Sequence, residues 1–143
     1  MATLKVEIVT PEAALWVGEA QALIARSSDG DFTILPEHTA TVGDIVPGIV
    51  RVETSEGEVA FAVHGGYFQV ETSLSEDWTN VTVLAGVAEK TTDIDVARAE
   101  ASKGRAEAAL GASARGESDD TPAHLLAQAA LDRAELRLRA ATR

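Results

Sequence analysis

The sequence of 143 residues contains no cysteine and few aromatic residues, namely two Trp, one Tyr and three Phe. Without cysteine the chain can form neither disulfide bonds nor thiolate sites. It also lacks an apolar run approaching the roughly 18 residues of a membrane span. Its N-terminus has no basic segment followed by an apolar one, the pattern of a signal peptide. We therefore expect a soluble protein that does not insert into a membrane but could sit on a membrane complex.

Charge is distributed unevenly along the chain, whose formal net charge is −11. Residues 1–92 contain 14 acidic and 4 basic residues, whereas residues 93–143 contain 9 acidic and 8 basic residues, seven of them arginine. The acidic first part argues against a nucleic acid partner, because binding would require phosphate neutralisation. The arginines could meet an anion or an acidic protein surface, although a solvated helix face is the more common meaning of mixed charges.

The first 85 residues predict short β-strands separated by turn residues. The expected strands are 4–9, 15–17, 20–25, 32–35, 49–52, 59–63, 67–70 and 81–85. Their spacing is typical of an antiparallel sandwich or barrel. Because the connections leave no room for crossover helices, a parallel sheet is not expected. Residues 71–80, polar apart from Leu74 and Trp78, are predicted to form a longer loop.

Residues 93–143 predict two helices. Asp93 is the expected N-cap of the first helix, with Asp95 in the first turn, where the helix dipole favours negative charge. This helix is expected to end at Leu110. The residues expected near one of its faces are Ile94, Ala97, Ala101 and Ala108.

A loop is predicted for residues 111–120, and Thr121-Pro122 provides an N-cap followed by proline at the first helical position. The second helix is expected to extend close to the C-terminus. Both helices are rich in alanine, which buries only a methyl group, against about 1.5–3 kcal/mol for a fully buried Leu or Ile. A hairpin held this weakly should be able to open.

The sequence shows no catalytic constellation. His64-Gly65-Gly66 is similar to an oxyanion-hole loop, but no Gly-x-Ser-x-Gly elbow supplies a nucleophile, so a glycine pair at a strand bend is the simpler interpretation. His38, His64 and His124 lack the i, i+4 partner of a helical metal site. Asp29-Gly30-Asp31 begins like a calcium loop without its closing glutamate. We therefore expect a non-catalytic protein that needs no metal for its fold.

Four charged residues of the predicted helices stand out. Asp95 and Arg98 are neighbours on one helix surface, and the simplest interpretation is an ion pair contributing about 0.3–0.5 kcal/mol. Arg133 and Arg137 have i, i+4 spacing and would repel each other. That arrangement is more reasonable if an anion lies between them. Folding the hairpin could bring Arg98, Arg133 and Arg137 together around that anion.

Six segments, in order along nearly the whole chain, resemble those of the epsilon subunit of the bacterial F-type ATP synthase. They are Val6–Glu12, Asp29–His38, Pro47–Arg51, Gly65–Val70, Val81–Ala85 and Ile94–Ala99. The resemblance implies an α+β fold that is mainly β: an antiparallel β-sandwich over residues 1–88, followed by an antiparallel two-helix hairpin over residues 89–143. The sandwich would bind the rotor, and the hairpin would be regulatory.

The resemblance also implies partners and site residues. The sandwich would bind the gamma subunit and the c-ring on the cytoplasmic face of the cell membrane, with Asp31 and His38 on a loop that contacts the ring. The folded hairpin would permit turnover and bind ATP as a regulatory ligand. The extended hairpin would reach into the alpha/beta catalytic head and block ATP hydrolysis. The residues implied to hold ATP are Glu89, the Ile94 backbone, Asp95, Arg98, Arg133 and Arg137.

Two other functions remain open. The chain could be a purely structural rotor adaptor with a permanently docked hairpin and no ATP sensing. It could also be an unrecognised small-molecule enzyme, which the missing nucleophile, base and metal constellations argue against.

Overall fold

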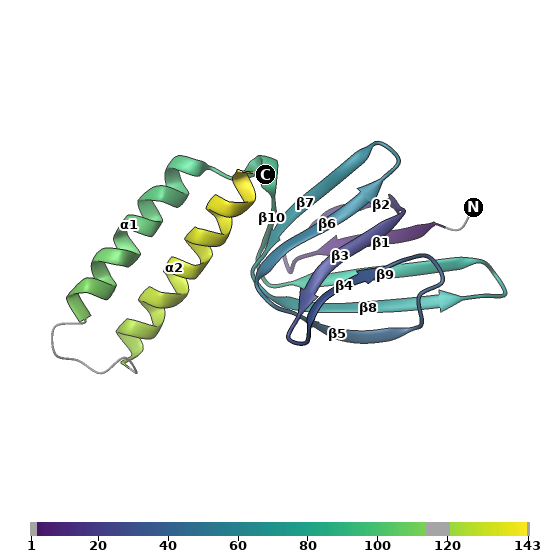
Figure 1. The fold of residues 1–143 in the computed structure, drawn as a ribbon, viewed down its shortest axis with the longest axis horizontal. Coiled ribbons are helices and arrows are strands. Elements are labelled where there is room, and N and C mark those ends of the chain that lie inside the picture. Colours follow the sequence, from purple (N-terminus) through teal and green to yellow (C-terminus); the bar gives the residue numbers. More distant parts are fainter. Residues whose placement is uncertain (1–2, 114–120, 143) are drawn as a thin grey trace. The chain divides into compact units, whose positions relative to one another are not determined.

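The computed structural model describes residues 3–113 and 121–142 (Figure 1). The chain divides into two compact units, Met1–Lys90 and Thr91–Arg143. The first unit is a β-sandwich and the second is a pair of helices. The fold class expected from the sequence, mainly β with a sandwich followed by a helical hairpin, is confirmed.

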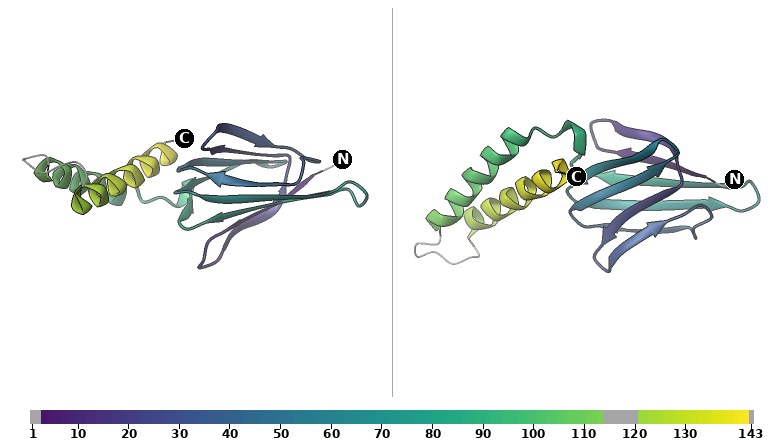
Figure 2. Two further views of the ribbon diagram at one scale, coloured as in Figure 1. Left: turned by 90° about the horizontal axis from the view of Figure 1, so that it is seen from below. Right: turned by 45° about the horizontal axis from the view of Figure 1, so that its top comes forward.

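The described part of the first unit contains ten strands in two five-stranded sheets, which face each other in Figure 2. In chain order the strands are β1 (Leu4–Val9), β2 (Ala14–Ala20), β3 (Ala22–Ser27), β4 (Gly30–Ile34), β5 (Thr41–Ile45), β6 (Gly48–Thr54), β7 (Gly57–Val63), β8 (Gly66–Ser73), β9 (Trp78–Ala85) and β10 (Ala88–Lys90). The strand order is β2-β1-β9-β8-β5 in one sheet and β10-β7-β6-β3-β4 in the other.

One strand pair departs from the antiparallel pattern that the short connections predicted. Strands β1 and β9 are parallel, with Leu4 opposite Thr79 and Val9 opposite Leu84, and the other described pairs are antiparallel. A parallel pair needs a long crossover. Because β1 and β9 are far apart in the sequence, the intervening strands supply that crossover without any helix.

The long loop predicted for residues 71–80 is wrong. Strand β8 continues to Ser73 and β9 begins at Trp78, with Glu71 opposite Asn80 and Thr72 opposite Thr79. The hairpin therefore extends over residues that looked like loop because they are polar. Apolar alternation is required only where a strand face is buried, so polar strand ends give no such signal.

Alternation of buried and exposed residues builds the sandwich core. In β1, Leu4, Val6 and Ile8 are buried, whereas the residues between them are exposed. Aromatic rings then bridge the two sheets. Phe32 of β4 stacks on Phe68 of β8 with ring centroids 4.5 Å apart. Across from Phe68, β5 has Gly43, where an added Cβ would lie only 2.5 Å from the ring.

The second unit contains a 3₁₀ turn, η1 (Thr91–Asp93), and two helices, α1 (Val96–Ser113) and α2 (Pro122–Ala141). The prediction for α2 is confirmed, since the Thr121 hydroxyl accepts from the backbone N–H of His124 and Pro122 is the first helical residue. The prediction that Asp93 caps the first helix is wrong. Asp93 ends the 3₁₀ turn, and α1 starts later, with Asp95 as its cap.

The face expected to be buried in the first helix is also wrong. Over residues 96–111 of α1 the buried residues are Ala99 and Ala106, whereas Ala97, Ala101 and Ala108 are exposed and Ile94 precedes the helix. The buried residues of α2 are Ala127, Ala134, Leu136 and Ala140. Because alanine occurs on nearly every side of α1, its spacing alone did not select one face. Helix α1 also passes the expected end at Leu110, and residues 114–120 of the predicted loop lie outside the described residues.

We predict that Gly66→Ala destabilises the sandwich. A Cβ at this position would lie 2.1 Å from the carbonyl oxygen of Leu84, a backbone atom on the neighbouring strand that cannot move aside. The expected loss is about 1–3 kcal/mol in the free energy of unfolding, measured by chemical denaturation. Gly86→Ala is the matched control, because no atom lies within 4 Å of its added Cβ. Equal stability of the two variants would contradict the prediction.

Candidate functional site

A groove of about 440 Å³ runs between α1 and α2. This volume lies in the range of about 300–1,000 Å³ that is typical of small-molecule sites. Its apolar lining consists of alanines from both helices together with Leu126. Its polar lining consists of Ser102 and three arginines, Arg105, Arg133 and Arg137. The groove therefore combines a shallow apolar floor with concentrated positive charge.

Helical spacing explains how these side chains reach one groove. Ser102, Arg105 and Ala109 are related by i, i+3 and i+7 on α1, and Arg133 and Arg137 are one turn apart on α2. Residues at these spacings share a helix face. The structure thus brings together the two arginines of α2 that the sequence singled out. It adds Arg105 and Ser102, which the sequence analysis missed.

Arg105 could have been found from the sequence by extending one stripe of α1. It follows Arg98 by seven residues, and Ser102 lies between them at i+4. Arg98 itself is exposed and is not part of the groove lining, but it lies on the same stripe one turn towards the start of α1. A guanidinium on this stripe can reach along the helix surface towards the groove, because its side chain is long and flexible.

Asp95 acts as a helix cap in the structure. Its carboxylate oxygen Oδ1 accepts from the backbone N–H of Arg98 at 3.0 Å, and its carbonyl accepts from the N–H of Ala99. The ion pair expected between the Asp95 and Arg98 side chains is not among the ion pairs of the described residues. Ile94 is half-buried and joins η1 to α1. The charge of Asp95 therefore serves the helix start.

Glu89 belongs to the sandwich unit, where it lies in β10 opposite Ala62 of β7. Its carboxylate Oε1 lies 3.7 Å from Nε2 of His64, whose side chain is only 5% exposed. His64 and Gly65 follow the end of β7 at Val63, and the chain bends there, with Gly65 at a φ of 101°. The His64-Gly65-Gly66 segment is thus a strand bend, as the simpler interpretation held.

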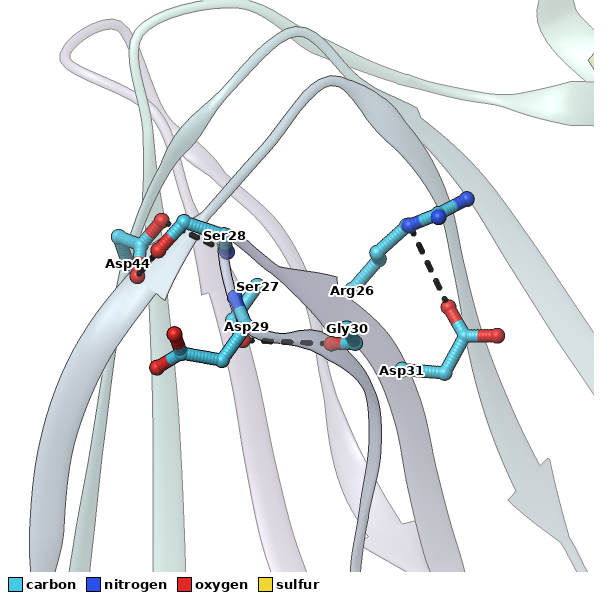
Figure 3. A network of polar contacts seen from close by, with 7 residues as sticks. All are labelled: Arg26, Ser27, Ser28, Asp29, Gly30, Asp31 and Asp44. Atoms are coloured by element: carbon cyan, nitrogen blue, oxygen red, sulfur yellow. Dashed lines mark hydrogen bonds and ion pairs between the residues drawn. The ribbon is translucent and has the colours of Figure 1, made fainter.

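The two residues predicted to contact a partner lie at opposite ends of β4. Asp31 lies near the start of the strand, is 80% exposed and pairs with Arg26 at 3.7 Å (Figure 3). His38 follows the other end, where its backbone carbonyl accepts from the Thr72 hydroxyl and its N–H donates to the carbonyl of Leu35. The expectation of one loop holding both residues is therefore wrong, because β4 separates them.

The described residues contain neither a candidate metal site nor a candidate membrane-spanning helix. No three His, Cys, Asp or Glu side chains are grouped there in a way that could hold a metal ion. Neither α1 nor α2 is both long enough and apolar enough to cross a bilayer. The guanidinium groups of the hairpin groove remain the most concentrated candidate chemistry in the part of the chain that the structure describes.

The two units correspond to two consecutive family models. Residues 3–91 match the β-sandwich domain of the ATP synthase delta/epsilon chain, and residues 92–142 match the long α-helix domain of the same chain. This chain belongs to the ATP synthase delta/epsilon family. The resemblance seen in the sequence is therefore confirmed over nearly its whole length.

Individual relatives of this delta/epsilon-family chain include bacterial proteins called ATP synthase epsilon chain. That of Desulforudis audaxviator is 41% identical over 111 residues, which cover 78% of this chain and 77% of the relative. That of Thermobifida fusca is 43% identical over 107 residues, covering 73% and 74%. A chain in the cryo-EM structure of the Euglena gracilis mitochondrial ATP synthase OSCP/F1/c-ring matches with a TM-score of 0.75 at 21% identity, covering 100% of this chain and 83% of that one. This last similarity shows the shared fold.

We predict that Asp95→Ala weakens the start of α1. Losing the cap should cost about 0.5–2 kcal/mol of local helix stability, so the amides of Arg98 and Ala99 should exchange faster in native-state hydrogen exchange. Asp95→Asn should exchange nearly as slowly as the native chain, because its side-chain oxygen still accepts the same hydrogen bond. Fast exchange in the Asn variant, equal to that in the Ala variant, would contradict the capping role.

Proposed function

We propose that this chain is the epsilon subunit of a bacterial F-type ATP synthase. It is a non-catalytic part of the central stalk that couples the rotor to the catalytic head, and its C-terminal hairpin responds to ATP and inhibits ATP hydrolysis. Membership of the delta/epsilon family over both units supports this assignment. So do relatives named ATP synthase epsilon chain at about 40% identity.

The proposed partners follow from the same family. The sandwich binds the gamma subunit and the c-ring, and the extended hairpin meets the alpha/beta head. The complex places the chain as a peripheral protein on the cytoplasmic face of the cell membrane. The exposed pair of Asp31 and Arg26 near one end of β4, and the half-buried His38 beyond the other end, support a contact with the ring. Charged groups that are exposed and held in place are suited to recognising a protein surface.

The main support for ATP sensing is the clustering of arginines in the hairpin groove. Arg105, Arg133 and Arg137 line one groove of the folded hairpin. Two of them lie one turn apart, a spacing at which like charges repel and a bound anion is attracted by both. Guanidinium groups bind phosphate oxygens through paired hydrogen bonds, and a triphosphate offers several such oxygens. The alanine floor offers a flat apolar surface against which a base can lie.

The remaining proposed ATP residues have supporting roles. Arg98 lies one turn beyond the groove on the same stripe of α1 and extends the positive charge towards the helix start. Asp95 and the Ile94 backbone form that start. Glu89 of β10, whose carboxylate lies beside His64, is the sixth proposed contact. These four come from the family resemblance, whereas Arg133 and Arg137 are supported by the groove as well.

The seam between the helices explains how ATP could shift the hairpin. Leu136 is the only large side chain among the buried residues of α2, and the others are alanines. A ligand that binds only the folded form stabilises it by RT ln(1 + [L]/Kd), about 2.7 kcal/mol at a hundredfold excess over Kd. For a seam that buries little apolar area, an increment of this size decides which form is populated.

A purely structural adaptor is the second candidate, and the helix starts favour it. Both helices begin with a side-chain cap, Asp95 for α1 and Thr121 for α2. Such caps stabilise the folded helices without any ligand. In this alternative the hairpin stays docked and ATP has no effect on it.

We predict saturable binding of ATP to the 143-residue chain in calorimetric titration. Arg133→Ala should weaken it about tenfold or more, because a charge-assisted hydrogen bond to phosphate is lost. Arg139→Ala is the matched control, since it removes the same charge from the same exposed helix but does not line the groove. Its Kd should stay within about twofold of the native value, because salt screens an exposed charge that lies outside the groove. Equal weakening by both variants, or no heat with the native chain, would contradict the groove as the ATP site.

We predict that ATP slows amide hydrogen exchange in α1 and α2 and leaves the sandwich strands unchanged. The physical reason is that the ligand stabilises only the folded hairpin. AMP is the matched control ligand, because it lacks the phosphates that the groove arginines would bind, and it should give little protection. Binding of ATP without any change in helix protection would favour the structural adaptor over the sensor.

A further inference from the structure

The turn between β3 and β4 is attached to a strand of the opposite sheet by a single carboxylate. Ser28, in this turn, donates its backbone N–H to Oδ2 of Asp44 and its hydroxyl to Oδ1, each at 3.0 Å (Figure 3). Asp44 lies in β5, which belongs to the other sheet. Both carboxylate oxygens of Asp44 are thus used to hold one residue of the turn.

A backbone hydrogen bond also joins the end of β5 to β3, close to the turn. The N–H of Val46, just after β5, donates to the carbonyl of Arg26 in β3 at 3.0 Å. The opposite sheet therefore holds this region at two places: at Ser28 within the turn, and at Arg26 in the strand that leads into it. A hairpin turn held at two points has fewer conformations to lose when a partner binds.

Hydrogen bonds within the turn also fix its shape. The Ser27 hydroxyl donates to the carbonyl of Gly30 at 3.2 Å and accepts from the N–H of Asp29 at 3.1 Å. Gly30 adopts a φ of 122°, which only glycine adopts without strain. Serine hydroxyls that bond to nearby backbone in this way fix turn geometry. The turn is thus a preformed structure.

The feature that this turn presents is the ion pair of Arg26 and Asp31. These side chains are 66% and 80% exposed. Figure 3 shows the pair on one side of the turn and Asp44 on the other. Asp44 therefore does not lie between the pair and solvent. It acts on the pair through the backbone of the turn.

Hydrogen bonds at such an exposed turn add little to the stability of the whole sandwich. Water competes for exposed donors and acceptors, and the net gain per bond is small. The core of the sandwich, built from the inward residues of both sheets, contains none of the turn residues 27–30. The main effect of the Asp44 contacts is therefore local order.

We infer that Asp44 is a positioning residue for the rotor contact. By fixing the β3–β4 turn, it holds Arg26 and Asp31 in the geometry in which they meet the partner, without touching the partner itself. This inference rests on the proposed function, in which Asp31 faces the c-ring. It adds a residue that lies outside the contact and whose carboxylate keeps the contacting turn in one conformation.

The test compares Asp44→Ala with the native full-length chain in two measurements. The first is amide hydrogen exchange of Ser28 and Asp29 by NMR. The second is the affinity for the gamma–c-ring complex purified from the same organism. We expect exchange at Ser28 to be roughly tenfold faster or more, because its acceptor is lost. We expect the affinity to fall roughly three- to tenfold, as an ordered turn becomes mobile before binding.

Three further variants separate positioning from other roles. Asp44→Asn keeps a hydrogen-bonding group on each branch but removes the charge, so exchange and affinity should both return close to native values. Ser28→Ala loses one of the two bonds with no change of charge and should give intermediate values. Asp29→Ala removes an exposed carboxylate from the same turn, and Ser28 exchange should then stay native.

Several outcomes would overturn the inference. Weak binding by Asp44→Asn with slow Ser28 exchange would mean that the charge of Asp44 meets the partner directly. Native affinity of Asp44→Ala despite fast exchange would mean that order in the turn does not matter to the contact. No binding by the native chain would overturn the proposed function and this inference with it. If Asp44→Ala, unlike Ser28→Ala, also lowers the thermal midpoint, Ser28→Ala is the deciding variant, and native exchange or native affinity in Ser28→Ala would overturn the inference.

Discussion

Burial of the inward face of each sheet against the other is the interaction on which the sandwich depends. Leu4, Val6 and Ile8 of β1 and the facing residues of the second sheet are almost completely buried. Phe32 and Phe68 join the sheets at one point and Trp16 and Phe61 at another. Because this core fixes the strands, the turns at their ends can be exposed and still be ordered. The β3–β4 turn is one such case.

The helical hairpin, in contrast, buries little apolar area between its elements. Its helices meet through alanines, which pack closely but bury little area, and α1 carries Gly104 in its interior. The caps at Asp95 and Thr121 stabilise each helix separately, whereas the seam stabilises their association only weakly. The sandwich therefore has a large apolar core, whereas the helices of the hairpin share only a small one.

Electrostatics divides the chain in the same way. The sandwich unit contains most of the net negative charge, and the hairpin concentrates arginine on one groove. Arg105, Arg133 and Arg137 line this groove, and Arg133 and Arg137 have the i, i+4 spacing at which like charges repel. An anion in the groove would turn this repulsion into attraction on both helices. Under the proposed function, a bound anion would add to the few apolar contacts that hold the folded hairpin together.

The sequence by itself determined that strands precede two helices, the family, the cap at Thr121 and the pair Arg133 and Arg137, because these depend on local spacing and turn chemistry. It did not determine which face of α1 is buried, since alanine occupies several faces and only contact with α2 selects Ala99 and Ala106. It also did not show the parallel pairing of β1 with β9, the length of the β8–β9 hairpin or the hold of Asp44 on Ser28. Those features join residues far apart in the chain, and only the packing of the two sheets decides such contacts.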